Sequence, residues 1–388
     1  MKTNNHKNIG IFTEYYNNYN YGGNLQAFAL QKFISKRFSY CEQIAFDFGY
    51  INSFFKRIKS IKKSNHREIA CFFISALKSL IKSIIYPKEN FLIKKRKSII
   101  ANFSYSITHS KKTYTKDDII EANKDYDIFI CGSDCIWDMT NNPYCTALGF
   151  VSDGKIKTSY AASLGSSTIP DGWADKYLDY VRELDTISVR EKTVASELQK
   201  LIPEKEINVS VDPTLLFTAE EWDSFLLHKG TKSKYVLHYI LSEDREQMQS
   251  ALKYTGNCNC KSLTFPNIHN YYHIWLNDYG DYRNYSGNPL DFVELIKYAE
   301  VVITDSFHAV IFSVLFHKPF YALKRETQSE YVGRVENFLE DVGLKSQMIT
   351  SKELESLKTI PQIDFTYADK VIAQNREKSI KYLEANLK

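Results

Sequence analysis

Short apolar segments alternate with helix-like segments along most of this chain, and that alternation constrains the fold more than any other feature. An apolar run at 7–16 leads through a loop into a helix-like segment at 18–38, and a second apolar run follows at 41–48. The same order recurs as far as 301–320, where a buried strand is expected to run into an apolar helix. Because strand–helix–strand units build parallel sheets covered by helices, the sequence predicts an α/β fold.

The chain has 388 residues, which is more than one hydrophobic core of this kind usually supports. We expect two Rossmann-like domains, at 1–215 and 216–365, with the carboxyl ends of their strands facing a shared cleft. Residues 366–388 predict a C-terminal helix that packs back on the first domain.

A basic segment at about 51–115 interrupts the first domain. Between Lys56 and Lys97 there are 13 Lys or Arg residues and only two acids, interleaved with Phe, Ile and Leu at helical spacing. One interpretation is a helical insertion that packs on its own domain and exposes a solvated basic face. The other is a set of amphipathic helices that dock on an anionic membrane surface. The segment contains no recognisable nucleic-acid-binding module, so nucleic acid is not an expected partner.

The apolar runs and the cysteines indicate a cytoplasmic protein. The N-terminal residues lack the apolar core of a signal peptide, and the sequence has no run of about 18 uncharged apolar residues that could span a membrane. The seven cysteines have neither a disulfide framework nor zinc-site spacing, so we expect a reducing compartment and no metal. We therefore expect the cytoplasm, with the basic segment able to hold the protein peripherally at the inner face of the cell membrane.

Polar residues follow several predicted strands, at the edge where ligands bind in such sheets. Gly22 and Gly23 open a helix and let a ligand approach the backbone, although a simple strand-to-helix turn explains them equally well. Ser133 and Asp134 follow a very apolar strand, and Trp137 nearby suits either a sugar platform or the core.

Two further strand ends carry groups that can bind anions. Arg190 lies where a strand meets a helix, so its guanidinium can grip a carboxylate or phosphate, or pair with Glu191. His308 lies in the first turn of an apolar helix, after the natural N-cap Ser306. The helix dipole there favours anions, so a bound phosphate would restore the proton affinity of the imidazole and make it a proton donor. The alternative is a structural histidine.

The chain resembles the polysaccharide pyruvyl transferase family in six segments, which are, in order, "NYGGNLQAFAL", "YDIFICGSDCIWD", "SYAASLG", "ISVREKT", "VDPTLLF" and "VITDSFHAVIFSVLFHKPF". The resemblance runs from about residue 8 to 325, apart from the basic segment. It implies a GT-B-like pair of Rossmann-type domains. It also implies transfer of the enolpyruvyl unit of phosphoenolpyruvate to a sugar as a cyclic ketal on two hydroxyls, with phosphoenolpyruvate as co-substrate and without a cofactor.

Carried onto this sequence, the resemblance implies that Arg190 holds the carboxylate or phosphate of the donor and that His308 is the acid; Asp134 is our choice of base. The residues expected to bind the donor are Ser306, Phe307, Lys318, Arg325, Gly22, Gly23 and Asn24. Those expected to bind the acceptor sugar are Ser133, Trp137, Tyr160 and Ser163. The chain departs from the family in its glycine pair, where many members have one glycine. It also has Ser-Phe before the histidine, where some members have Arg-Leu. Lys318 and Arg325 are therefore candidates to help hold the phosphate.

The expected acceptor is a sugar of a capsule or cell-surface polysaccharide precursor carried on a lipid. One alternative is a GT-B glycosyltransferase that uses a nucleotide sugar. That enzyme would need an acid for the ribose at a strand end of the second domain, and Asp305 is the one candidate in the sequence. A non-enzymatic scaffold of a sugar-assembly complex is a third interpretation.

Overall fold

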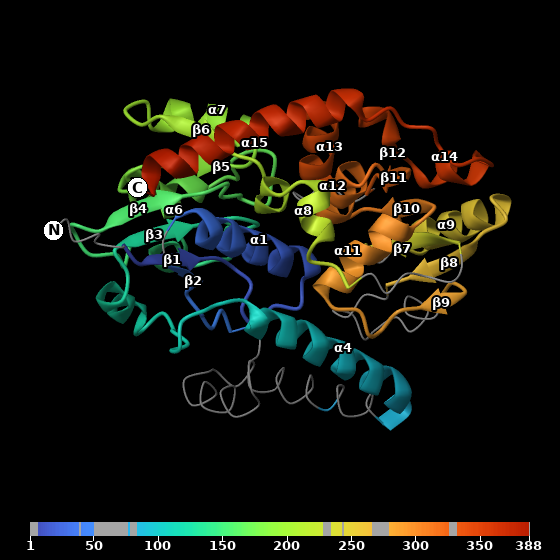
Figure 1. The fold of residues 1–388 in the computed structure, drawn as a ribbon, viewed down its shortest axis with the longest axis horizontal. Coiled ribbons are helices and arrows are strands. Elements are labelled where there is room, and N and C mark those ends of the chain that lie inside the picture. The colour runs from blue at the N-terminus through green and yellow to red at the C-terminus, as the bar shows by residue number, and fades with distance from the viewer. Residues whose placement is uncertain are drawn as a thin grey trace.

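The structure, a computed structural model, describes residues 7–38, 40–49, 77, 84–227, 234–242, 244–265, 279–325 and 332–387. These residues form two parallel sheets, which lie beside each other and are flanked by helices in Figure 1. The prediction of an α/β fold with two Rossmann-like domains is confirmed. The part of the basic segment at 51–76 and 78–83 lies outside the described residues.

The first sheet comes from the N-terminal half of the chain. Its core is four parallel strands in the order β2 (Cys41–Gln43), β1 (Ile9–Phe12), β3 (Ile128–Cys131) and β4 (Ile156–Ser159). Parallel bridges add residues 109–114 beside β2, and add β5 (Ile187–Val189) and then β6 (Ile207–Val209) beyond β4. Counted with 109–114 as the third strand, the order is that of a Rossmann fold with one more strand at its far edge.

The second sheet has the same order of strands. The strands run parallel as β9 (Tyr282–Arg283), β8 (Lys261–Thr264), β7 (Tyr235–Tyr239), β10 (Val301–Thr304), β11 (Phe320–Leu323) and β12 (Met348–Ile349). Because the chain order reverses between β7 and β10, a crevice is expected where these two strands end, and helix α12 begins there.

Helices follow the strands along the chain, and the sequence predicts some of their N-terminal caps. The capping box indicated by Thr218 and Glu221 is present at the start of α8. The helices are α1 (Tyr21–Arg37), α4 (Pro87–Ser106), η1 (Ile119–Lys124), α5 (Pro143–Thr146), α6 (Trp173–Arg182), α7 (Lys192–Leu201), η2 (Pro213–Leu216), α8 (Ala219–Asp223), α9 (Arg245–Asn257), α11 (Pro289–Tyr298), α12 (Phe307–Leu315), α13 (Val332–Asp341), η3 (Lys345–Gln347), α14 (Ser351–Ser356) and α15 (Thr366–Asn386).

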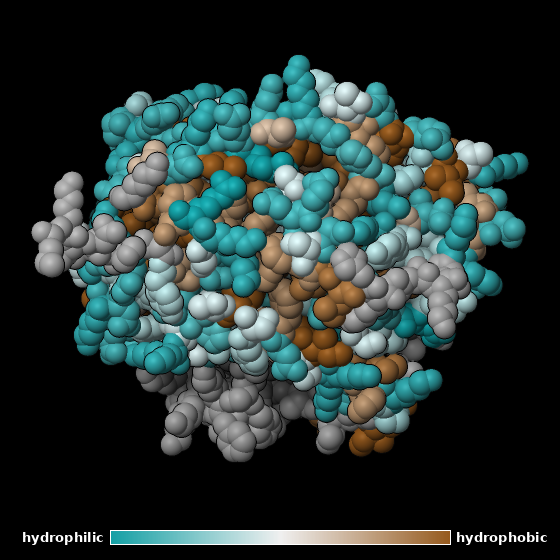
Figure 2. Space-filling model, in the orientation of Figure 1, coloured by the Kyte–Doolittle hydropathy of each residue, from teal (hydrophilic) through white to brown (hydrophobic). Residues whose placement is uncertain are grey.

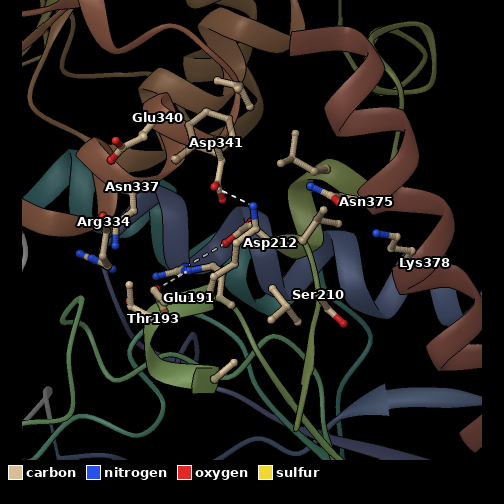
Figure 3. A pocket seen from close by; sticks show the side chains of 18 of the residues that line it. Glu191, Thr193, Ser210, Asp212, Arg334, Asn337, Glu340, Asp341, Asn375 and Lys378 are labelled. Carbon is tan, nitrogen blue, oxygen red and sulfur yellow. Dashed lines mark hydrogen bonds and ion pairs between the residues drawn. The ribbon is translucent and has the colours of Figure 1, made fainter. Parts of the chain in front are cut away.

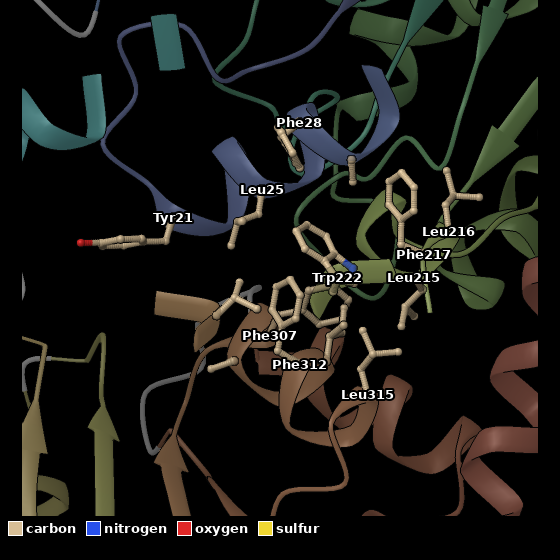
Figure 4. Packing of buried hydrophobic residues seen from close by; sticks show 14 of the residues in the cluster. Tyr21, Leu25, Phe28, Leu215, Leu216, Phe217, Trp222, Phe307, Phe312 and Leu315 are labelled. Carbon is tan, nitrogen blue, oxygen red and sulfur yellow. The ribbon is translucent and has the colours of Figure 1, made fainter. Parts of the chain in front are cut away.

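One hydrophobic cluster joins the two domains. Trp222 lies between helix α1 of the first domain and helix α12 of the second, as Figure 4 shows. Its ring meets Phe312 edge-on at 5.0 Å and lies 6.1 Å from Phe28. Because this contact is packed like a core, the N-terminus of α1 is held against the N-terminus of α12. The candidate site lies where these two helices begin.

Helix α15 bridges both domains and runs across one side of the molecule in Figure 1. On the first domain, the Tyr382 hydroxyl donates to Ser159 O at 2.9 Å, and Ser379 Oγ accepts from Val211 N at 3.0 Å. On the second domain, Asp369 pairs with His317 at 2.8 Å. Among the helices that the structure describes, none is both long and apolar enough to cross a membrane.

Candidate active site

His308 is the second residue of helix α12, directly after strand β10. Ser306 occupies the predicted N-cap position, but its side chain makes no capping hydrogen bond. An anion at this end of the helix would meet first-turn N–H groups that no side chain caps, together with the helix dipole. The imidazole is buried, and its Nε2 has no hydrogen-bond partner among the described residues.

Helix α1 brings Gly22 directly against this imidazole. A Cβ atom at Gly22 would lie 2.0 Å from His308 Nδ1, so the contact requires a residue without a side chain. At Gly23 a Cβ atom would lie 3.3 Å from Asp134 Oδ2. The two glycines therefore do bring a functional group close to the backbone, but in this structure that group is a side chain of the protein.

The other polar groups at the start of α1 are used within the chain. The amides of Gly22 and Gly23 donate to Asn20 Oδ1 at 2.9 and 3.4 Å. The Asn24 side-chain nitrogen donates to Asn18 O and Asn20 O, and its Oδ1 is buried without a hydrogen-bond partner among the described residues. This helix end is thus capped, in contrast to that of α12.

Arg190 lies at the centre of a buried ionic network. Its Nε donates to Glu191 Oε1 at 2.9 Å, Nη1 to Asp212 Oδ2 at 3.0 Å and Nη2 to Ser163 Oγ at 2.9 Å. The guanidinium lies 4.4 Å from the Phe307 ring centroid, and the side chain is 5% exposed. Burial lowers the pKa of Arg190, but the nearby carboxylates of Glu191 and Asp212 raise it by a larger amount. The pKa therefore lies above its ordinary value, and the group stays charged.

Asp212 is a member of the site that the sequence analysis did not single out. Its carboxylate bonds Arg190 and lies 3.5 Å from His308 Nε2, so it links the two residues expected to do the chemistry. Burial raises its pKa, but His308 and Arg190 lower it more, and the pKa of Asp212 is held below its usual range. The signal was present: Asp212 is the only acid in "VDPTLLF", one of the six segments that carry the resemblance.

Asp134 follows strand β3 and pairs with an arginine of the second domain. Its Oδ1 lies 3.6 Å from Arg334 Nη1, which also donates to Cys135 Sγ at 3.3 Å. The Arg334 guanidinium lies 5.8 Å from the centroid of the Phe307 ring, the ring that Arg190 also contacts. Arg334, from the first turns of α13, is a second cation at the cleft that the sequence analysis missed, because nothing near it in the sequence marks a site.

The expected acceptor-binding residues lie in the interior instead. Trp137 is fully buried in a hydrophobic cluster of the first domain and Tyr160 in the cluster that joins the two domains, so neither ring can serve as a sugar platform here. The Ser133 hydroxyl donates to Ala161 O, and that of Ser163 to Glu191. These side chains are packed in the interior or hydrogen-bonded to other protein groups. A sequence pattern does not show whether a side chain is buried in this way or exposed to a ligand.

Lys318 and Arg325, the two other cations expected to help hold the phosphate, lie in different places. Lys318 follows the far end of α12, which at about 1.5 Å per residue puts it more than ~12 Å from the helix start, so it does not accompany His308. Arg325 lies two residues after the end of strand β11 and donates from Nε to Asp305 Oδ2 at 2.9 Å, beside the start of α12. Asp305 in turn accepts the amides of Leu241 and Ser242, so it serves the loop after β7.

A cavity of about 730 Å³ opens beside this network, between the two domains. Figure 3 shows Arg334, Asn337 and Asp341 on α13 facing Asn375 and Lys378 on α15 across it. Its wall also includes Arg190, Asp212 and Phe307. Among the described residues, no group of three or more His, Cys, Asp or Glu side chains is arranged to hold a metal ion.

Two tandem Rossmann-like domains with a polar cleft between them define a GT-B-like fold. The UDP-GlcNAc 2-epimerase of Methanocaldococcus jannaschii is similar to this structure, with a TM-score of 0.51 and 10% identity over 97% of this chain and 99% of that one. The glycosyltransferase SnogD from Streptomyces nogalater aligns with a TM-score of 0.46 and 8% identity, over 98% and 99% of the chains. In sequence, no curated protein matches this chain.

The chain belongs to the polysaccharide pyruvyl transferase family, whose sequence profile matches residues 20–327. It is therefore a transferase. The matched range includes Gly22, Asp134, Arg190, Asp212 and His308, whereas Arg334 and the other cavity residues of α13 and α15 lie beyond it.

Proposed function

We propose that this transferase moves the enolpyruvyl unit of phosphoenolpyruvate onto two hydroxyls of a sugar in a cell-surface polysaccharide precursor. Family membership supports the reaction class. The observation that carries the proposal is the buried His308, which combines an uncapped helix N-terminus with a carboxylate 3.5 Å from its Nε2.

The reaction requires one acid, one base and groups that hold an anion. The methylene of phosphoenolpyruvate takes a proton and becomes a methyl group, and a sugar hydroxyl attacks the adjacent carbon. Phosphate then leaves with the electrons of its C–O bond, and a second hydroxyl closes the ketal. Of the two protons that the sugar hydroxyls lose, one replaces the proton that the acid gave to the methylene, and the other leaves with phosphate.

His308 is proposed as the acid for the methylene. Asp212 faces Nε2, so it can hold the imidazole in one orientation for proton transfer. The other ring nitrogen, Nδ1, lies on the Gly22 side and is the atom proposed to exchange a proton with the substrate. Asp134, at the end of β3, is proposed as the base for the sugar hydroxyls.

The donor's negative charge is proposed to be held by the start of α12 and by the cleft arginines. Arg190 uses three of its five N–H donors on protein groups, so it can still contribute to an anion site, but two carboxylates already balance its charge. Arg325 bonds Asp305, directly before the start of α12, and is proposed to add positive charge there. Electrostatic stabilisation of this kind needs no metal.

The test is phosphate release by the purified enzyme. Release should require both phosphoenolpyruvate and a sugar acceptor, and mass spectrometry should find the ketal on the sugar. Release of a nucleotide from a nucleotide sugar would favour the glycosyltransferase alternative. If neither reaction occurs with an acceptor series that includes lipid-linked sugars, the scaffold interpretation is favoured.

Two substitutions divide the roles. His308→Gln should lower kcat by about a hundredfold or more, because general-acid catalysis contributes ~10²–10⁴. His317→Gln is the matched control, since that imidazole follows the C-terminal end of α12, is exposed and pairs with Asp369. Arg190→Lys should raise the KM for phosphoenolpyruvate more than it lowers kcat. Unchanged turnover in His308→Gln would remove this residue from the mechanism.

A membrane-bound acceptor is also part of the proposal. At the start of α4, Ile84 is 71% exposed and Phe91 66%, and the basic residues Lys88, Lys94 and Lys95 lie around them and are exposed. Apolar side chains flanked by lysines are typical of helices that lie on anionic bilayers. In Figure 2, hydrophobic residues reach the surface at the lower right, where α4 begins in Figure 1.

Liposome flotation tests this part separately. Binding should need anionic lipid, should weaken as salt rises, and should fall in Ile84→Ser combined with Phe91→Ser. Leu227→Ser is a suitable control, because that side chain is equally exposed (65%) on another part of the surface. Liposome binding that does not change with salt concentration and is unchanged in the double variant would contradict the proposal.

A further inference from the structure

We infer that the cavity between α7, β6, α13 and α15 binds the acceptor saccharide, and that Glu191 and Asn375 select its hydroxyl groups. This inference rests on the proposed function and gives it a second substrate site. It replaces the acceptor residues expected from the sequence, which are buried in the interior.

The cavity lies in the right position for a second substrate. Arg190, Asp212 and Phe307 form part of its wall, and Asp212 contacts the imidazole of His308 from the other side. A ligand in the cavity therefore reaches the network of Arg190 and Asp212 without displacing the imidazole, which lies behind Asp212. At about 730 Å³, the volume falls within the ~300–1,000 Å³ of ligand sites, which is ample for a saccharide.

Two uncharged amides of the wall, those of Asn337 and Asn375, can bind sugar hydroxyls, whereas the hydroxyls of Thr193 and Ser196 and the amide of Gln199 hydrogen-bond within the protein. The two amides come from α13 and α15, and Figure 3 shows Asn337 and Asn375 on opposite sides of the space. An apolar face is present as well, because the Phe307 and Phe338 rings meet edge-on at 6.0 Å. The polar wall residues that are uncharged are Thr193, Ser196, Gln199, Ser210, Asn337 and Asn375.

The charge of the wall favours a neutral ligand over a diphosphate. Its four cations, Arg190, Lys192, Arg334 and Lys378, are matched by the four carboxylates Glu191, Asp212, Glu340 and Asp341. Lys192 and Asp341 pair directly at 2.7 Å. A site for a nucleotide diphosphate would need an excess of cations, and here the carboxylate of Glu191, the N-cap residue of α7, adds negative charge at the start of that helix although its side chain makes no capping hydrogen bond.

Glu191 points most directly to the ligand. Its side chain is 4% exposed, and Oε1 accepts hydrogen bonds from Arg190 and Ser163. The second oxygen, Oε2, is buried in the cavity wall without a hydrogen-bond partner among the described residues. A buried carboxylate oxygen is costly to leave unsatisfied, and a sugar hydroxyl is a donor that would satisfy it.

Saccharide binding can be measured directly, without phosphoenolpyruvate. Saturation-transfer-difference NMR with a panel of methyl pyranosides and disaccharides should detect at least one ligand of the wild-type enzyme. Glu191→Gln preserves the shape and the acceptor for Arg190 but puts a donor at the second position, so it should weaken binding about tenfold. Asn375→Leu should weaken it by a similar factor.

The control variant is Gln374→Leu. It removes a side-chain amide from the neighbouring position of α15, where the residue is exposed and outside the cavity, and it should bind like the wild type. Thermal unfolding of all variants verifies that they fold. If Glu191→Gln fails to fold, Asn375→Leu against Gln374→Leu still tests the cavity.

Three results would overturn the inference: no binding by any glycoside of the panel, unchanged binding in both cavity variants, or weakened binding of UDP but not of glycosides in those variants. Phosphate release separates this from the proposed function. If glycosides bind through Asn375 but phosphoenolpyruvate never yields phosphate, the saccharide site stands and the pyruvyl-transfer proposal fails. If phosphate is released and the acceptor KM is unchanged in Glu191→Gln and Asn375→Leu, the pyruvyl-transfer proposal stands and the saccharide site fails.

Discussion

Replacing Gly22 by alanine tests whether the contact between the two domains positions the catalytic imidazole. The new Cβ atom would lie 2.0 Å from His308 Nδ1 and 2.6 Å from its Cε1, whereas ordinary contacts begin at 3.4 Å. The ring must therefore move by about 1.4 Å, or α1 must move away from α12. Both movements are resisted by the hydrophobic cluster around Trp222, which holds the two helices together.

The expected loss is mainly one of activity. Overpacking a close contact costs about 1–3 kcal/mol, while alanine in place of glycine in a helix returns ~0.5–1 kcal/mol, so the free energy of unfolding should fall by no more than ~2.5 kcal/mol. A displacement of about 1 Å at a catalytic group can cost ~10² in rate. We therefore expect kcat for phosphate release to fall about a hundredfold in an enzyme that remains folded.

Gly23→Ala is the matched control, one position further along the same helix. Its Cβ atom would lie 3.3 Å from both Asp134 Oδ2 and Glu14 O, so a shift of about a tenth of an ångström relieves the contact. This variant should keep turnover within about threefold of the wild type and should be equally or more stable. If Gly22→Ala and Gly23→Ala have the same turnover, close to that of the wild type, the imidazole is not positioned by this contact and the reasoning fails.

Three further results are expected. Asp212→Asn should lower the free energy of unfolding at pH 7 by about 3 kcal/mol, because it removes a carboxylate from a buried ion pair. Since the pKa of Asp212 is held below its usual range, this difference should narrow as the pH falls below about 4, and a constant difference in urea titrations would contradict it. Burial lowers the pKa of His238 to about 3, so the unfolded chain binds a proton that the folded chain does not. Below about pH 6.5 the wild type should lose up to ~1.4 kcal/mol per pH unit on this account, and His238→Gln should lose less. Arg96→Met should lower thermal stability by several degrees and Lys95→Met should not, because Arg96 Nε donates to the buried Tyr21 hydroxyl at 2.9 Å whereas Lys95 is exposed.

The alternation of apolar runs and helices was sufficient to predict the α/β fold, because side-chain periodicity is a local property. Strand β10 and helix α12 have the bounds that "VVITDSFHAVIFSVL" suggests, and Ser306 does occupy the N-cap position. The match of the family profile to residues 20–327 agrees with the resemblance stated from the six segments. The third strand position of the first sheet was not predicted, because residues 109–114 are separated from their partner strand by the long basic segment.

The structure brings some of the expected site residues together and separates others. Arg190 and His308 do lie in one network, and Arg325 lies at the start of α12. Trp137 and Tyr160 were assigned to a sugar because an aromatic residue after a strand looks the same in the sequence whether it faces a cleft or the core. Asp212 was missed for the opposite reason, since its position between a guanidinium and an imidazole arises only when three distant segments meet.

The sequence alone determined which helices and strands form and which end of each sheet carries the polar residues, since those follow from neighbours a few residues apart. The tertiary structure decided how these residues are used. It put Gly22 against His308, balanced Arg190 with Glu191 and Asp212, and left the cavity wall without net charge. The physical reason is that pairing, burial and electrostatic balance depend on distances between groups that lie far apart in the chain, and only the packing of the two domains sets those distances.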